Sequence, residues 1–211
     1  PGQHPYKDDK KLEIARMRND LNIIKEAGFN AVRTWSELTE EEVALIQESG
    51  LLLVYGIWIL PDGDFDDPQF VADAKVQVKK VMEWSKNYDC IITYLIMNEP
   101  MVAHIHEKGA QNTIDLWTGL TEIIHEGHPG IPVTISNNSA IGEYLNERIF
   151  DVYGFNTYDY KEGLPGFTQG FANHFKYLKE LNGEDKPVLV TEFGMSVSPI
   201  GWGMYGGNTR G

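Results

Sequence analysis

Hydrophobic residues recur along this chain with two alternating periods. From residue 11 onward, Ile14, Met17, Leu21 and Ile24 are spaced by three or four positions, which predicts a helix packed on a core by one face. Short runs rich in β-branched residues come between such helices and predict buried strands. We predict helices over about residues 11–28, 39–50, 67–87, 113–126, 141–148 and 167–181, and strands over about residues 30–35, 51–59, 91–97, 132–137, 151–157 and 187–193.

Local signals place several helix ends. Thr39 and Glu42 have the spacing of a capping box, in which each side chain bonds the backbone amide of the other residue. Asp67 precedes a proline, a sequence typical of a helix start. Gly28 and Gly127 follow helical stripes, and we expect them to end those helices.

The regular alternation of strands and helices decides the fold class. It predicts an α/β fold with a parallel sheet, either a doubly wound sheet or a (β/α)8 TIM barrel. A doubly wound nucleotide fold would carry a glycine-rich phosphate turn, and neither G-x-G-x-x-G nor a Walker run is present. We therefore predict one catalytic barrel over residues 1–211. Six units are two short of a barrel, so we expect the first strand before Pro1 and the last unit after Gly211.

Composition restricts the partners of this chain. With 211 residues, 42% of them hydrophobic, the chain is long enough for one large core. A net charge of −13 argues against nucleic acid, since phosphate binding needs clustered Lys and Arg, and it favours a neutral substrate. No stretch reaches the roughly 20 apolar residues of a membrane span.

We expect neither a metal nor a cofactor. A single cysteine, Cys90, excludes an intrachain disulfide and a cysteine-based metal site, and its place before a strand predicts burial. Residues 62–67 look like the start of a calcium loop, but the glycine and glutamate required further along are missing, so we interpret them as a turn with a helix cap. His104 and His106 lack further ligands at metal-binding spacing and are expected to line a cleft or face solvent.

Two glutamates at strand ends are the candidate catalytic residues. Glu99 follows the apolar run 91–97, and Glu192 lies near the end of the run 187–193. In a parallel barrel all strands end on one face, so we expect the two side chains to meet there. Glycosidic cleavage uses one protonated and one ionised carboxyl group, about 5–5.5 Å apart in retaining enzymes. Each glutamate alone could also be a structural carboxylate.

Further candidates follow the same strands. Arg33 would bring a positive charge that keeps Glu192 ionised, and Tyr158 could donate a hydrogen bond to that carboxylate. Asn98 could bond a sugar hydroxyl. Aromatic side chains at strand ends suit the apolar faces of sugar rings, although core packing is the alternative for each. These aromatic candidates are Trp35, Trp58, Tyr160 and Trp202.

With these residues placed, the chain resembles the catalytic barrels of glycoside hydrolase clan A, and most closely those of family 2. The segment 24–33 is similar to the part of family 2 enzymes that leads into the second barrel strand, Asn98-Glu99-Pro100 resembles the clan's acid/base motif, and residues 191–194 resemble its nucleophile motif. Residues 151–158 are similar to the strand that supplies the clan's tyrosine. The resemblance implies that Glu99 is the general acid/base and Glu192 the nucleophile. It also implies that Arg33 and Tyr158 support the nucleophile and that Asn98 contacts the 2-hydroxyl.

Departures from family 2 leave alternatives open. After Arg33 the chain reads Thr-Trp-Ser-Glu where galactosidases and glucuronidases of the family usually carry a His-Tyr-Pro-like turn, which weakens those two substrates. The Arg-Thr-Trp sequence is closer to some β-mannanases, and residues 153–158 also resemble β-1,3-glucan transglycosylases. A retaining glycosidase acting on a neutral β-linked sugar is our first interpretation. A transglycosylase, a non-catalytic sugar-binding barrel and an inactive fragment are the alternatives. The resemblance implies a longer chain with additional domains, and it slightly favours an extracellular or periplasmic location.

Overall fold

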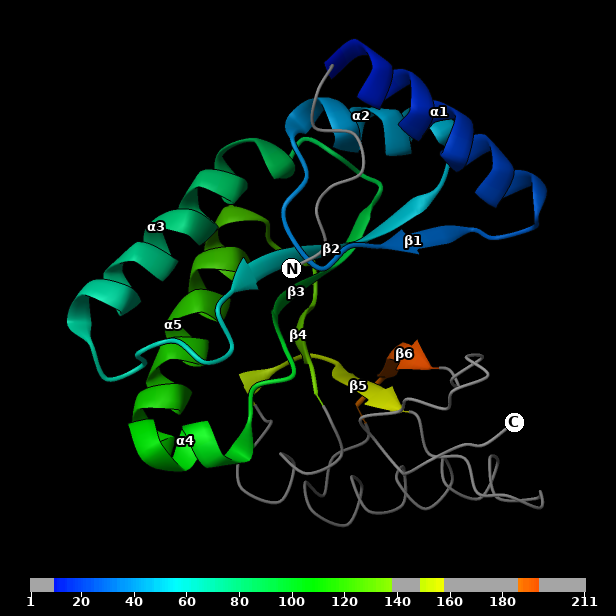
Figure 1. The fold of residues 1–211 in the computed structure, drawn as a ribbon. Helices are drawn as coiled ribbons and strands as arrows, with labels where there is room; N and C mark the ends of the chain where they lie inside the picture. Colours follow the sequence, from blue (N-terminus) through cyan, green and yellow to red (C-terminus); the bar gives the residue numbers. More distant parts are fainter. Residues whose placement is uncertain (1–9, 138–148, 158–185, 194–211) are drawn as a thin grey trace, which may run out of the picture.

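The structure, a computed structural model, describes residues 10–137, 149–157 and 186–193 (Figure 1). Helices and strands alternate along the described chain, as the hydrophobic pattern predicts. The helices are α1 (Lys10–Glu26), α2 (Glu40–Ser49), α3 (Pro68–Ser85), α4 (Val102–Lys108) and α5 (Ala110–Gly127). The strands are β1 (Ala31–Arg33), β2 (Leu52–Ile59), β3 (Ile91–Asn98), β4 (Val133–Ser136), β5 (Tyr153–Thr157) and β6 (Val188–Phe193).

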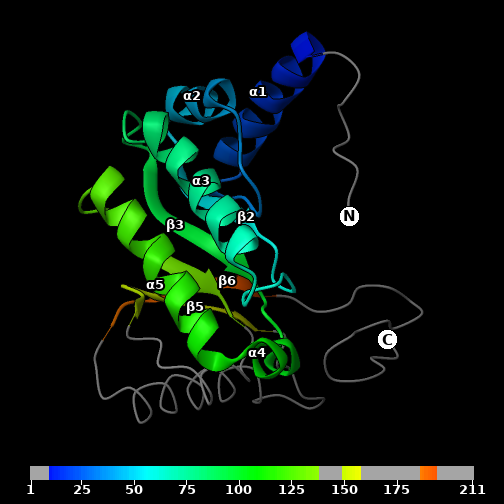
Figure 2. The same ribbon diagram turned by 90° about the vertical axis from the view of Figure 1, so that its left-hand side faces the viewer.

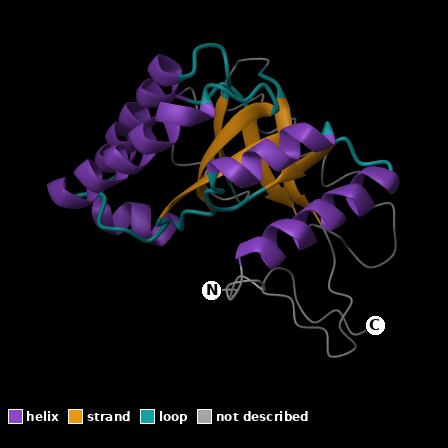
Figure 3. Cartoon of the chain, turned by 90° about the horizontal axis from the view of Figure 1, so that it is seen from above, coloured by secondary structure: helices purple, strands orange, loops and turns teal. Residues whose placement is uncertain are grey.

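All described strand pairs are parallel. Strands β1 to β4 form one sheet in chain order, and β5 pairs with β6 in a second sheet. A single parallel bridge between Asn137 and Phe155 connects the end of β4 to β5. Figure 3 shows the helices on the outer side of the strands. This order is that of a TIM barrel, in which every strand ends on the same face.

The core lies between the four-stranded sheet and helices α3 and α5. Figure 2 shows these two helices side by side over β2 and β3. Most residues of β2 and β3 are buried, as expected for strands covered on both faces. The largest fully buried side chains include Trp117, Tyr55 and Tyr94. Cys90 is buried as predicted, at 5% exposure.

Most predicted helix ends are confirmed. Thr39 and Glu42 form the reciprocal bonds of a capping box, and the Asp67 side chain accepts from the amide of Gln69. Gly28 has a φ of +90°, which glycine adopts without a side-chain clash, and the amides of Gly28 and Phe29 close the end of α1. None of the described helices is long and apolar enough to cross a membrane.

Gly127 ends a helix as predicted, and one helix was missed by the sequence analysis. Gly127 is the last residue of α5, and a Cβ there would lie 2.6 Å from Cβ of Met82. It therefore permits close packing between α5 and α3. Helix α4 was not predicted, because Ile105 is its one buried residue and a single apolar position shows no periodicity. The helices predicted over residues 141–148 and 167–181 lie outside the described residues.

Candidate active site

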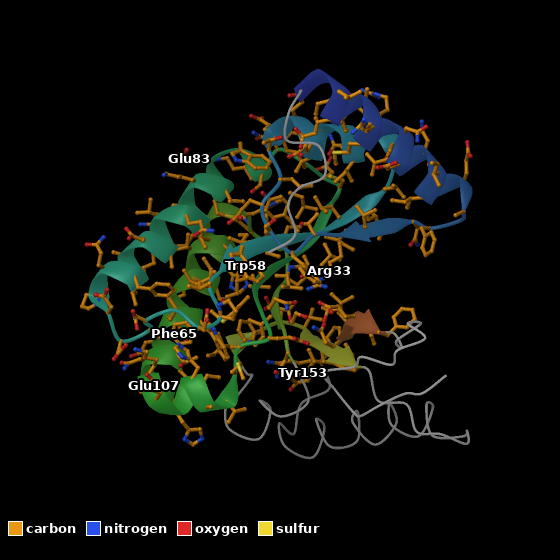
Figure 4. All side chains as sticks on the ribbon, viewed as in Figure 1. Arg33, Trp58, Phe65, Glu83, Glu107 and Tyr153 are labelled. Carbon is orange, nitrogen blue, oxygen red and sulfur yellow. The ribbon has the colours of Figure 1, made fainter. Side chains whose placement is uncertain are left out.

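Three strand ends bring polar side chains to one rim of the barrel. Arg33 ends β1, Asn98 ends β3 and Glu99 follows it directly. Glu192 is the penultimate residue of β6. Because the strands are parallel, these side chains meet although more than 150 positions separate Arg33 from Glu192. In Figure 4 the labelled Arg33 lies near the centre of the molecule, whereas Glu83 and Glu107 lie on outer helices.

Arg33 is bonded to Glu192, as the sequence predicted. Its Nη1 atom lies 2.8 Å from Oε1 of Glu192 and 3.3 Å from the carbonyl oxygen of Thr191. The two charged side chains are 15% and 16% exposed, so water screens their attraction only in part. A guanidinium in this position holds the orientation of the carboxylate.

The second terminal nitrogen of Arg33 fixes Asn98. Nη2 donates to Oδ1 of Asn98 over 2.8 Å. Since the amide oxygen is used in this bond, the amide nitrogen of Asn98 is the part that remains available to donate. The amide nitrogen of Asn98 can therefore donate a hydrogen bond to a sugar hydroxyl that lies beside Glu99.

Glu99 leaves β3 with an unusual backbone. Its φ is +48°, and it is the one non-glycine residue with positive φ among the described residues. Such a conformation costs on the order of 1–3 kcal/mol and persists where surrounding contacts enforce it. Here the amide of Glu99 donates to the carbonyl oxygen of Ser136 over 2.7 Å, which ties the residue to the end of β4. The strained backbone of Glu99 thus ends the strand at the candidate acid residue.

Asn156 contacts Glu99 and was missed by the sequence analysis. Its Nδ2 atom donates to Oε1 of Glu99 over 2.7 Å, and its Oδ1 atom accepts from the hydroxyls of Ser136 and Thr191. Asn156 and Ser136 are 5% and 0% exposed. Polar residues at buried positions near strand ends were the available signal, because a buried amide needs partners.

Two short paths therefore join the two glutamates. Arg33 bonds Glu192 and also Asn98, the residue before Glu99. Thr191, the residue before Glu192, bonds Asn156, which in turn bonds Glu99. A pair of carboxyl groups on one rim, one held by a guanidinium and the other by an amide, can divide the roles of base and acid.

Comparison with known proteins identifies the family. The family model described as glycosyl hydrolases family 2, TIM barrel domain, matches residues 3–206. The chain belongs to glycosyl hydrolase family 2.

Relatives of this family 2 barrel are longer proteins. A β-galactosidase of Vibrio cholerae is 28% identical over 110 residues, which cover 48% of this chain and 11% of the relative. A β-glucuronidase of Bacteroides uniformis superposes with a TM-score of 0.70 at 20% identity, covering 89% of this chain and 23% of its own. A β-galacturonidase of Eisenbergiella tayi superposes with a TM-score of 0.71 at 21% identity, covering 86% of this chain and 32% of its own. These similarities to solved structures establish the barrel fold.

Two of the predicted aromatic residues of the family 2 barrel are exposed near the rim. Trp35 is 56% exposed, and the centroid of its ring lies 5.9 Å from Cζ of Arg33. Trp58 is 36% exposed, and Figure 4 shows it at the end of β2. Its amide donates to Glu37, which also accepts from Gln77. The remaining predicted site residues, Tyr158, Tyr160 and Trp202, lie outside the described residues.

The acidic turn before α3 is tied to α4. Asp64 and Asp66 form ion pairs with Lys108, and the hydrogen bond to Lys108 lowers the pKa of Asp64. His104 is half-buried, with Nε2 2.7 Å from the carbonyl oxygen of Gly63. Over the described ranges, no group of three or more His, Cys, Asp and Glu side chains is arranged to hold a metal ion. The turn and α4 are therefore linked by protein contacts.

Proposed function

We propose that the protein containing this chain is a retaining β-glycosidase that acts on a neutral β-linked sugar. The observation that carries the proposal is the pair of glutamates on one rim, with Arg33 held against Glu192 and Asn156 held against Glu99. Membership in family 2 supports the same reaction. The chain spans 11% of the Vibrio cholerae β-galactosidase and 23% of the Bacteroides uniformis β-glucuronidase. The proposal therefore concerns the whole protein of which this chain is a part.

In the first step, Glu192 attacks the anomeric carbon. A bond forms between a carboxylate oxygen and that carbon, and the glycosidic bond breaks while Glu99 gives its proton to the leaving oxygen. In the second step, Glu99 takes a proton from a water molecule. That water attacks the anomeric carbon, the bond to Glu192 breaks, and the sugar leaves with the configuration it started with. Direct attack requires carboxyl groups about 5–5.5 Å apart.

The surrounding residues have supporting roles in this proposal. Arg33 keeps Glu192 ionised and oriented through the 2.8 Å contact. Asn98 presents its amide nitrogen to the 2-hydroxyl of the sugar, because Arg33 occupies its oxygen. We assign Tyr158, which directly follows β5, to a hydrogen bond with Glu192. Trp35 and Trp58, together with Tyr160 and Trp202, would stack on sugar rings.

The charge at the rim favours a neutral sugar. A uronic acid would bring a carboxylate that requires a cation. In the described part of the chain, the cation that the strand ends bring to this rim is Arg33, and both of its terminal nitrogens already contact protein oxygens. A panel of aryl β-glycosides tests this point: turnover of a β-glucuronide that exceeds turnover of every neutral glycoside would contradict it.

Azide rescue tests the assignment of the two glutamates. In the full-length protein, Glu192→Ala should abolish turnover of an aryl β-glycoside, and azide should restore it with an α-glycosyl azide as product. Glu99→Ala should still form the glycosyl-enzyme from substrates with good leaving groups, and azide should then give the β product. Glu107→Ala is the matched control, because this exposed glutamate lies on the outer helix α4 (Figure 4). The same anomer from both mutants would contradict the roles.

A transglycosylase differs from a hydrolase in the acceptor alone. Water takes the glycosyl group from Glu192 in one case and a sugar hydroxyl in the other. Mass spectrometry of the products from a defined oligosaccharide separates them, because a transglycosylase yields species longer than the substrate. A sugar-binding barrel without catalysis would bind the oligosaccharide and leave it intact.

A further inference from the structure

Building on the proposed function, we infer that Asn156 is a positioning residue for Glu99 and determines which carboxyl oxygen carries the catalytic proton. Asn156 lies on β5, between Ser136 at the end of β4 and Thr191 on β6. Its amide contacts Glu99 Oε1 at 2.7 Å. In this arrangement, Oε1 of Glu99 accepts the hydrogen bond from Asn156 throughout the reaction. Oε2 of Glu99 gives up and takes back the catalytic proton.

The orientation of the amide follows from its partners. Oδ1 of Asn156 lies 2.6 Å from Oγ of Ser136 and 2.7 Å from Oγ1 of Thr191, and both hydroxyls can donate to it. Hydroxyls can also accept, so they do not settle the orientation alone. An ionised Glu99 settles it, because a carboxylate accepts hydrogen bonds and cannot donate one. The nitrogen of Asn156 must therefore face Glu99 whenever Glu99 is ionised.

The same orientation also suits the protonated acid. A protonated carboxyl group has one carbonyl oxygen that accepts well and one hydroxyl oxygen that donates. Because the Asn156 amide donates to Oε1, the carbonyl position is at Oε1 and the proton is at Oε2. The amide is thus in place for both halves of the reaction, with no rotation between them.

Burial makes this contact effective. Asn156 and Ser136 are almost fully buried, so water does not compete well for their hydrogen bonds. The backbone fixes the position further, since the amide of Asn156 donates to the carbonyl oxygen of Asn137 over 2.7 Å. A hydrogen bond to an ionised acceptor is roughly twice as strong as one between neutral groups. The Asn156 contact therefore strengthens as Glu99 loses its proton, which favours departure of the leaving group.

The test compares leaving groups in the full-length protein. Asn156→Ala should lower kcat/KM roughly 10- to 100-fold for an unactivated phenyl β-glycoside, whose departure needs the proton of Glu99. For a 2,4-dinitrophenyl β-glycoside, which departs without a proton, the loss should be below about 3-fold. The basic limb of the kcat/KM profile on the phenyl substrate should move to higher pH, because the ionised form of Glu99 has lost a hydrogen bond. Asn112→Ala is the matched control, since this exposed amide bonds the carbonyl oxygen of Lys108.

A second variant keeps the inference testable if Asn156→Ala does not fold. Thr191→Val preserves the shape of the side chain and removes one hydroxyl from Oδ1 of Asn156. It should show the same dependence on the leaving group with a smaller loss. Equal losses on both substrates with an unmoved basic limb would overturn the inference. If wild-type protein cleaves neither substrate, the proposed function fails instead. If Glu99→Ala shows the leaving-group dependence and both network variants do not, the positioning role alone fails.

Discussion

Replacing Arg33 by methionine separates a catalytic role from a structural one. Methionine is unbranched and reaches about as far as the Nε atom of arginine, so the change removes the guanidinium and keeps the packing of the apolar stem. Glu192 then loses the partner at 2.8 Å, and Asn98 loses the donor to its amide oxygen. The carboxylate should become easier to protonate, because the positive charge that favoured its ionised form is gone.

The burial of the pair sets the expected cost in stability. Removing one partner of a buried ion pair destabilises a protein by about 3–5 kcal/mol, whereas exposed pairs contribute about 0–1 kcal/mol. The side chains of Arg33 and Glu192 are 15% and 16% exposed, so we expect the free energy of unfolding to fall by about 3 kcal/mol, the lower end of the buried range. Arg18→Met is the matched control, because Arg18 and Glu48 form a 3.0 Å pair with side chains 56% and 59% exposed. The control should lose less than about 1 kcal/mol.

The kinetic assay is the pH dependence of kcat/KM on an aryl β-glycoside. In Arg33→Met the acidic limb should move to higher pH, since a protonated Glu192 cannot attack the sugar. Urea denaturation of the same variant measures the stability loss separately. If the acidic limb keeps its position and the variant loses only stability, Arg33 is a structural ion pair and its role toward the nucleophile must be withdrawn.

Two further predictions concern packing and alkaline stability. Gly56→Ala should lower the free energy of unfolding by about 1–3 kcal/mol in urea, because a Cβ at this position would lie 2.3 Å from the carbonyl oxygen of Thr34; an unchanged midpoint would show that the segment carrying Trp35 can move away. Burial raises the pKa of Tyr94 to about 12 from 10.0, so its contribution to stability is complete below pH 10 and is lost as the pH rises toward 12. Tyr94→Phe should reduce that alkaline loss by at most about 3 kcal/mol, and equal pH dependence in both proteins would contradict the assignment.

Much of the fold was predictable from the sequence because its signals are local. A helical stripe or an apolar run reports which face of one element is buried, and a capping box reports where a helix begins. Each end of β1 to β6 lies within two residues of the predicted position, and the capping box of Thr39 and Glu42 is present. Helix α4 has too few buried positions to show a helical period, so only the structure revealed it.

The contact between Arg33 and Glu192 was also predictable, since parallel strands end on one face of a barrel and few charged residues follow strands. The position of Asn156 was not. Its partners Glu99, Ser136 and Thr191 lie 57, 20 and 35 residues away in the sequence. The register between β4, β5 and β6 decides which of their side chains face one another, and a shift of one residue would turn Asn156 to the other side of its strand. Strand order in the sequence thus determined which residues reach the rim, and tertiary packing decided that Asn156 bonds Glu99 there.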